Sequence, residues 1–155
     1  MKEQPVSQLT RRLIEAELYG HLYETMTEIS GKEKALEIIS ENLKKSAFKA
    51  GQAFAATVEK PSLAHFATVV EIWKKGDAIV VEEISVDNNI LTIKVVRCRY
   101  QESYRDMGLP EELCPILSCC RDEPFAKGYS DKLSMKRATT LAEGGDCCPF
   151  EFIWE

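Results

Sequence analysis

Hydrolytic reactions and metal binding rely on thiols, carboxylates and guanidinium groups, and four neighbourhoods in the C-terminal half of the chain carry them. These are Cys98-Arg99, residues 119–122 (CCRD), Arg137, and residues 143–148 (EGGDCC). A thiolate acts as a nucleophile, a carboxylate acts as a general base, and a guanidinium fork binds a substrate carboxylate through two hydrogen bonds. Each of these chemistries requires the segments to meet in the fold.

The adjacent thiols of Cys119 and Cys120 are candidate nucleophiles, because Arg121 beside them supplies a cation that would favour the thiolate. Asp122 is a candidate general base, or the group that holds an attacking water. The alternative for each thiol is burial, since a free cysteine packs as a small apolar side chain and is among the most buried residue types. The residues alone leave both interpretations open.

A metal site is a further alternative, with Cys119, Cys120, Asp122 and Cys148 as its candidate ligands. Structural zinc sites usually contain two paired Cys-x-x-Cys or His-x-x-x-His units, and neither unit occurs here. Both histidines of the chain fall in predicted N-terminal helices. The cofactor is therefore undetermined, and a divalent metal such as zinc is the candidate.

Arg137 lies in a segment with strand-like alternation, where an arginine either faces solvent or clamps a substrate carboxylate. Arg121 is the second candidate for that contact. The EGGD segment that contains Glu143 and Asp146 either forms only a turn or brings two carboxylates to the rim of a pocket. Arg137, Arg121, Glu143 and Asp146 are thus the candidate substrate-binding residues.

The bulk composition excludes several classes of protein. The chain has 155 residues and a net charge of −5, and it lacks the basic cluster of a nucleic-acid-binding protein. The N-terminal segment lacks the apolar core of a signal peptide, and no apolar run reaches the roughly 18 residues of a spanning helix. We therefore expect a cytoplasmic protein with reduced thiols and no membrane contact, whose partner is a small-molecule substrate.

The length fits a single domain over residues 1–155, with a helical N-terminal part at 1–76 and a sheet and motif part at 77–155. Two long helices that meet at Ser30-Gly31 are predicted from apolar residues at three- and four-residue steps. The expected buried stripes are Ile14, Leu18, Leu22, Met26 and Ile29, then Ala35, Ile39, Leu43, Ala47 and Ala50. A third helix runs from residues 60–62 to residues 76–77, with Phe66, Val69, Val70 and Trp73 inward. Such long amphipathic helices leave a homodimer open.

β-Branched residues dominate the segments 78–86 and 90–98, and the DNN between them predicts a hairpin. Two short helical pieces broken at residues 108–110 follow, then a strand at 133–142, the EGGD turn, and a strand at 147–154. Pro149 in that last segment indicates a strand start or an edge strand. The fold class is therefore α+β: N-terminal helices packed on an antiparallel sheet of about four strands, with a helical cysteine-bearing insertion.

The order and spacing of three motifs are specific when taken together. They are Cys-x-x-Asp at 119–122, Arg-x-Thr at 137–139, and Leu-Ala-Glu-Gly-x-Asp-x-Cys-x-Phe-x-Phe at 141–152, with Phe125 and Gly128-Tyr129 between them. Over residues 79–152 this pattern resembles the L-2-amino-thiazoline-4-carboxylic acid hydrolase family of bacterial proteins. One position departs from it, because Pro149 stands where the family pattern has aspartate.

The resemblance implies hydrolytic opening of the thiazoline ring of a cyclic, cysteine-derived amidine, with N-carbamoyl-cysteine as the product. It implies catalytic roles for Cys119, Asp122 and Cys148, and Pro149 bears on activity if the replaced aspartate is catalytic. The alternative from another class is a non-catalytic small-molecule-binding domain with a cysteine-lined pocket, which would bind a metal or sense redox state.

Overall fold

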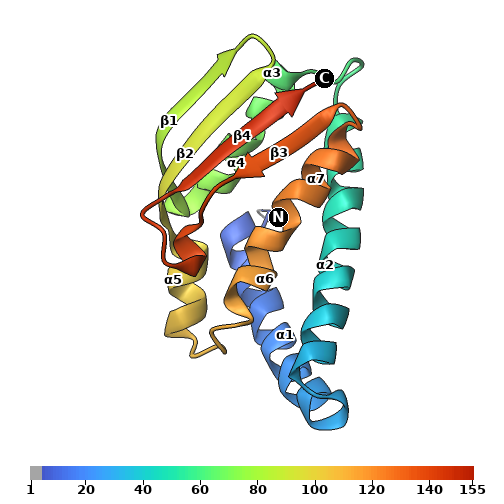
Figure 1. The fold of residues 1–155 in the computed structure, drawn as a ribbon, viewed down its shortest axis with the longest axis vertical. Coiled ribbons are helices and arrows are strands. Elements are labelled where there is room, and N and C mark those ends of the chain that lie inside the picture. The colour runs from blue at the N-terminus through green and yellow to red at the C-terminus, as the bar shows by residue number, and fades with distance from the viewer. Residues whose placement is uncertain (1–4) are drawn as a thin grey trace.

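The computed structural model describes residues 5–155 and has an α+β architecture, in which helices pack against a four-stranded antiparallel sheet (Figure 1). This confirms the predicted fold class. The first four residues of the predicted helical part lie outside the described residues. None of the helices within residues 5–155 is long and apolar enough to cross a membrane.

The chain begins with two long antiparallel helices, α1 (Gln8–Ser30) and α2 (Lys32–Ala55), which Figure 1 shows running down and back up the molecule. Ser7 caps α1, because its hydroxyl accepts a hydrogen bond from the Thr10 amide at 3.1 Å. Gly31 separates the helices with a φ of 85°, a conformation that glycine adopts without steric cost. The predicted stripe of α2 is buried from Ala35 to Ala47, whereas Ala50 is exposed.

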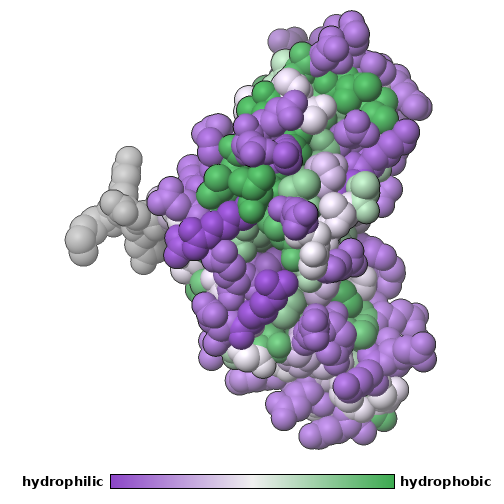
Figure 2. Space-filling model, turned by 60° about the vertical axis from the view of Figure 1, so that its left-hand side comes forward, coloured by the Kyte–Doolittle hydropathy of each residue, from purple (hydrophilic) through white to green (hydrophobic). Residues whose placement is uncertain are grey.

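The predicted stripe of α1 is wrong at four of its five residues, and only Met26 packs against the core. Ile14, Leu18, Leu22 and Ile29 are between 42% and 80% exposed. The buried residues of α1 are instead Ala16 and Tyr23. These two residues make the contact of α1 with the rest of the protein for different reasons. The helix lies close to its neighbours at Ala16, and the Tyr23 hydroxyl donates to the Glu112 carboxylate at 2.7 Å. Apolar side chains also reach the surface between polar ones on the face drawn in Figure 2.

The predicted third helix is divided in two, as α3 (Leu63–Ala67) and α4 (Val69–Lys74), followed by the 3-10 turn η1 (Lys75–Asp77). The break lies at Thr68, whose hydroxyl donates to the His65 carbonyl at 2.7 Å and so ends the first piece. The inward face is as predicted, with Phe66, Val69 and Val70 buried and Trp73 packed against the core.

The sheet has the order β1-β2-β4-β3, formed by β1 (Ile79–Asp87), β2 (Ile90–Cys98), β4 (Cys148–Trp154) and β3 (Leu133–Arg137). The predicted hairpin is β1–β2. The predicted strand at 133–142 ends at Arg137, because the chain then turns through the 3-10 segment η3 (Leu141–Glu143). Pro149 is the second residue of a central strand, so it marks a strand start and not a sheet edge.

The insertion between β2 and β3 contains α5 (Arg99–Asp106), α6 (Cys114–Ser118), the 3-10 turn η2 (Cys119–Arg121) and α7 (Asp122–Tyr129). The sequence predicted two helical pieces here and missed α7. This helix lies alongside α2 (Figure 1), and two glycines allow the contact. A Cβ atom on Gly51 would lie 2.1 Å from the Phe125 carbonyl oxygen, and one on Gly128 would lie 2.0 Å from the Phe48 carbonyl oxygen. The backbones of α2 and α7 therefore touch, which fixes the position of Asp122 at the start of α7.

Candidate active site

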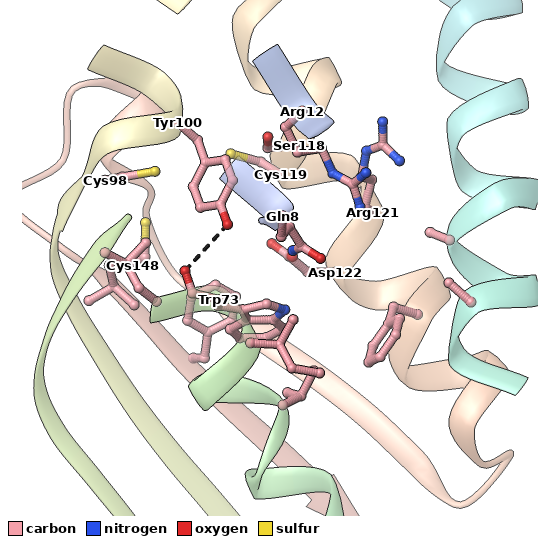
Figure 3. A pocket seen from close by; sticks show the side chains of 18 of the residues that line it. Gln8, Arg12, Trp73, Cys98, Tyr100, Ser118, Cys119, Arg121, Asp122 and Cys148 are labelled. Atoms are coloured by element: carbon pink, nitrogen blue, oxygen red, sulfur yellow. Dashed lines mark hydrogen bonds between the residues drawn. The ribbon is translucent and has the colours of Figure 1, made fainter. Parts of the chain in front are cut away.

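A cavity of about 370 Å³ lies between the N-terminal helices, the inner face of the sheet and the start of α7 (Figure 3). Its volume is in the range of small-molecule sites, roughly 300–1,000 Å³. Five of the residues singled out in the sequence line it. They are Cys119, Arg121, Asp122, Arg137 and Cys148. The fold thus brings together side chains from η2, α7, β3 and β4.

Asp122 and Arg137 form an ion pair in this cavity. Asp122 is the first residue of α7 and Arg137 is the last residue of β3, and Arg137 Nη1 lies 2.5 Å from Asp122 Oδ2. The second terminal nitrogen, Nη2, donates to the Cys119 carbonyl at 3.2 Å. The guanidinium group also lies 5.0 Å from the centre of the Phe150 ring. These contacts hold the Asp122 carboxylate in one place.

Burial raises the pKa of Asp122 to about 6, although the charge and hydrogen bond of Arg137 act in the opposite direction. The Asp122 side chain is 22% exposed, and it borders the cavity. At neutral pH the group is therefore mostly ionised, with a basicity above that of an ordinary carboxylate. These are the properties of a general base that works near pH 7.

The cavity thiols have high pKa values. Burial and then the negative charge of Asp122 raise the pKa of Cys119, burial raises the pKa of Cys148, and burial raises the pKa of Cys98 to about 11. Burial also raises the pKa of Cys120, which outweighs the opposing effect of Arg121. The lowered thiol pKa that a cysteine nucleophile needs is therefore not found, and all four groups are protonated at neutral pH.

The rate of alkylation tests whether the Cys119 thiol is protonated. In the folded protein at pH 7.5 we expect iodoacetamide to modify Cys119 at least about tenfold more slowly than it modifies free cysteine, because only the thiolate reacts. Mass spectrometry of the peptide that contains Cys119 follows the rate, and the urea-unfolded protein serves as the control. Modification of folded Cys119 as fast as free cysteine would restore the nucleophile hypothesis.

Three residues proposed from the sequence lie outside the cavity. The Cys120 thiol donates to the Ile116 carbonyl at 2.7 Å and borders a separate depression. Glu143 and Asp146 are exposed and do not line the cavity. Glu143 instead closes η3, where its carboxylate accepts a hydrogen bond from the Thr140 hydroxyl at 3.3 Å. The EGGD segment therefore forms a turn, and its carboxylates are not at the cavity rim.

The metal candidates are not arranged as a metal site. Within residues 5–155, no three histidine, cysteine, aspartate or glutamate side chains lie close enough together to hold a metal ion. Asp122 is paired with Arg137, and Cys120 donates its S–H to the Ile116 carbonyl and does not line the cavity that holds Cys119 and Cys148. The residues present do not fit the zinc that the sequence left open.

Sequence reasoning missed the part of the cavity that the N-terminal half supplies. These residues include Gln8, Arg12 and Glu15 of α1, together with Phe54 and Trp73, which form an aromatic wall with Phe125 and Phe150 of the C-terminal half. Cys98 at the end of β2, the thiol of the Cys98-Arg99 pair, also lines the cavity, as does Tyr100 of α5, which the sequence did not indicate. Figure 3 shows Cys98 and Cys148 on the same side of the cavity. Burial raises the pKa of Tyr100 to about 12, and its hydroxyl donates to the Trp73 carbonyl at 3.3 Å.

A helical pair packed on a four-stranded sheet, with an ion-paired carboxylate and guanidinium in the cavity between them, defines a small α+β protein with a cavity of small-molecule size. The chain matches the model of the L-2-amino-thiazoline-4-carboxylic acid hydrolase family over residues 11–152 and belongs to that family. The match includes the N-terminal helices, and so it extends well beyond the residues 79–152 expected from the motifs.

Among solved structures, the phenol-responsive sensory domain of the transcription activator PoxR, determined with phenol, is similar in fold. Its TM-score is 0.54 at 10% sequence identity, and the alignment covers 99% of this chain and 79% of that one. At this identity the similarity concerns the fold alone. A search of curated proteins found no significant match.

Proposed function

We propose that the protein hydrolyses 2-amino-thiazoline-4-carboxylate to N-carbamoyl-cysteine. The observation that carries the proposal is the Asp122 carboxylate, which Arg137 holds at the cavity and whose pKa burial raises to about 6. Membership of the hydrolase family supports it. Six free thiols suit a reducing compartment, and we propose the cytoplasm.

In this reaction one water molecule is added and nothing is oxidised or reduced. Asp122 accepts a proton from water as the water oxygen attacks the amidine carbon between the ring nitrogen and the ring sulfur. The carbon–sulfur bond then breaks. The two protons of the water end on the ring nitrogen and on the departing sulfur. Arg137 acts on Asp122, by orienting the carboxylate, and not on the substrate.

The protonated thiols have a role that fits their high pKa values. A departing sulfur carries developing negative charge, which a hydrogen-bond donor stabilises. Cys119 and Cys148 line the cavity as S–H groups, and the sulfur of Cys148 already accepts a hydrogen bond from the Leu141 amide at 3.2 Å. We assign these two thiols to the leaving sulfur and not to nucleophilic attack.

The pH dependence of turnover tests the role of Asp122. We expect kcat/KM to rise with pH and to level off above about pH 6, because only the ionised Asp122 accepts the proton of water. In Asp122→Asn this rise with pH should be absent, so that the residual kcat/KM is constant between pH 5 and 8. Initial rates across this range measure it. An inflection that persists in the variant would assign the titration to another group.

A second candidate function is ligand binding without turnover. The aromatic wall formed by Phe54, Trp73, Phe125 and Phe150 favours it, since such a wall suits an apolar ring, and the similar solved domain responds to phenol. Incubation of the unaltered protein with 2-amino-thiazoline-4-carboxylate separates the two functions. Release of a free thiol supports the hydrolase. Absence of thiol release, together with saturable binding of phenol, supports the binding domain.

A further inference from the structure

The charges that line the cavity are unlike those of the whole protein. The chain carries a net charge of −5. Yet within residues 5–155 the cavity is lined by four arginines and two carboxylates; they are Arg11, Arg12, Arg121 and Arg137, with Glu15 and Asp122. A concave site with an excess of one charge attracts ligands of the opposite charge. The cavity is therefore built for an anionic ligand, and the question is which guanidinium groups bind the anion.

Arg137 has little capacity left for a ligand. One terminal nitrogen is paired with Asp122, the other donates to the Cys119 carbonyl, and the plane of the group lies over the Phe150 ring. Its side chain is 13% exposed. Burial acts to lower the pKa of Arg137, but the charge and the hydrogen bond of Asp122, together with the neighbouring Cys119 and Cys148, raise it overall, so Arg137 is stabilised as a cation without a ligand.

Arg12 and Arg121 are in the opposite situation. Both donate to the same carboxylate, because Arg12 Nη1 and Arg121 Nη2 each lie 3.0 Å from Glu15 Oε2. Two cations thus share one anion. Arg121 is held further by the hydrogen bond from its Nε to the Leu117 carbonyl at 2.8 Å, and its side chain is 10% exposed. Within residues 5–155, Arg121 Nη1 and Arg12 Nη2 make no hydrogen bond to the protein.

Burial and the charge of Arg12 lower the pKa of Arg121, as expected for a cation that lacks full compensation. The two arginines lie next to each other at the end of the cavity that also holds Asp122 (Figure 3). Guanidinium forks bind carboxylates in two-pronged geometry, and they do so most strongly where water is excluded. A ligand carboxylate placed here would supply the missing anion.

We propose that Arg12 and Arg121, held together by Glu15, form the binding site for the carboxylate of the ligand, and that Arg137 is a positioning residue for Asp122. This inference rests on the proposed function in naming the ligand as 2-amino-thiazoline-4-carboxylate. The chain supports the arrangement, because Arg121 directly precedes Asp122 and the general base therefore lies beside the carboxylate site. In the ligand, only the ring nitrogen and the carboxylate-bearing carbon separate the amidine carbon from the carboxylate.

The test compares two substrates that differ only in the carboxylate, 2-amino-thiazoline-4-carboxylate and 2-amino-thiazoline. In Arg12→Gln and in Arg121→Gln, KM for the carboxylate substrate should rise about tenfold or more, since a hydrogen bond to a charged group is lost. The KM for 2-amino-thiazoline should stay within about twofold of the unaltered protein, and kcat should change little, because the lost contact is made equally before and in the transition state. Arg12→Lys should restore part of the affinity.

Arg97→Gln is the matched control, because it removes the same charge from an exposed ion pair with Glu102 that does not line the cavity. It should leave both KM values unchanged. Arg12 lies on α1, and Arg121 lies in the insertion. If Arg121→Gln fails to fold, Arg12→Gln therefore still provides a test. The assignment would be overturned if KM rose equally for both substrates, or if KM for the carboxylate substrate were unchanged in Arg12→Gln.

Calorimetric titration in the Asp122→Asn background separates this inference from the proposed function, because binding is then measured without turnover. The anion site is supported if Asp122→Asn binds 2-amino-thiazoline-4-carboxylate more tightly than 2-amino-thiazoline and if the double variant Asp122→Asn/Arg12→Gln loses this difference in affinity. This holds even if the unaltered protein proves inactive. Equal affinity for both compounds overturns the anion site, even if the unaltered protein is active. Absence of binding of either compound overturns both proposals.

Discussion

Asp122→Asn is expected to lower kcat by about a hundredfold or more, the usual contribution of a positioned general base. The substitution nearly preserves shape, and the asparagine oxygen still accepts the hydrogen bond from Arg137. Among the described residues it removes the one cavity carboxylate besides Glu15, and Glu15 is engaged by two arginines. The neutral amide cannot take a proton from water. Thiol release from 2-amino-thiazoline-4-carboxylate measures the loss.

The same substitution has a structural cost that must be separated from the catalytic one. Arg137 is largely buried and loses the charge of its partner, so we expect the free energy of unfolding to fall by about 1–3 kcal/mol. Rates are therefore compared at a temperature at which circular dichroism shows both proteins folded. Glu123→Gln is the matched control, because Glu123 is the next residue of α7 but is exposed and outside the cavity. Full turnover in folded Asp122→Asn would remove Asp122 from the mechanism.

Gly51→Ala is expected to destabilise the protein by more than about 3 kcal/mol, which lowers the melting temperature of a chain of this size by roughly 6–12 °C. The added methyl carbon would lie 2.1 Å from the Phe125 carbonyl oxygen and 2.8 Å from the Tyr129 amide nitrogen. Both atoms are backbone, so relief requires α7 to move away from α2. Because α7 begins with Asp122, this shift should also reduce turnover in the fraction that folds.

Gly20→Ala provides the control for the helix propensity of the new alanine. Gly20 also lies inside a long helix, but its added methyl group meets only the Leu109 Cδ2 atom at 2.8 Å, the end of a flexible side chain. Replacement of an interior helical glycine by alanine favours the helix by about 1 kcal/mol. We therefore expect Gly20→Ala to be neutral or slightly stabilising. Similar melting temperatures for Gly51→Ala and Gly20→Ala would show that the α2–α7 contact relaxes readily.

The sequence predicted the elements whose signal is local. β-Branched runs around the DNN segment define the hairpin, and the order of helices and strands gives the fold class. The motif spacing also singled out Asp122 and Arg137, which the fold pairs across α7 and β3. It did not show which thiol of the adjacent pair lines the cavity, because this depends on how η2 packs: Cys119 lines the cavity, and Cys120 does not.

Long-range packing explains the remaining differences. The apolar periodicity of α1 identifies one face of the helix, but its partner helices contact the face that carries Ala16 and Tyr23. Arg12 and Glu15 lie three residues apart on this helix, a spacing typical of an ordinary surface ion pair. Their connection to Arg121, more than a hundred residues along the chain, depends on how α1 docks against the insertion. No local pattern contains that information.

The separate location of the two charge clusters has a consequence for ligand orientation. Asp122 and Arg137 form a neutral pair, and beside this pair Arg12 and Arg121 share Glu15 in a cationic group. The cavity thus presents a fixed electric dipole to whatever enters it. A zwitterion with its carboxylate at one end and its amidinium at the other gains energy in one alignment and loses it in the reverse. Among regioisomers of equal size and shape, the cavity should therefore admit the one whose amidinium faces the ionised aspartate.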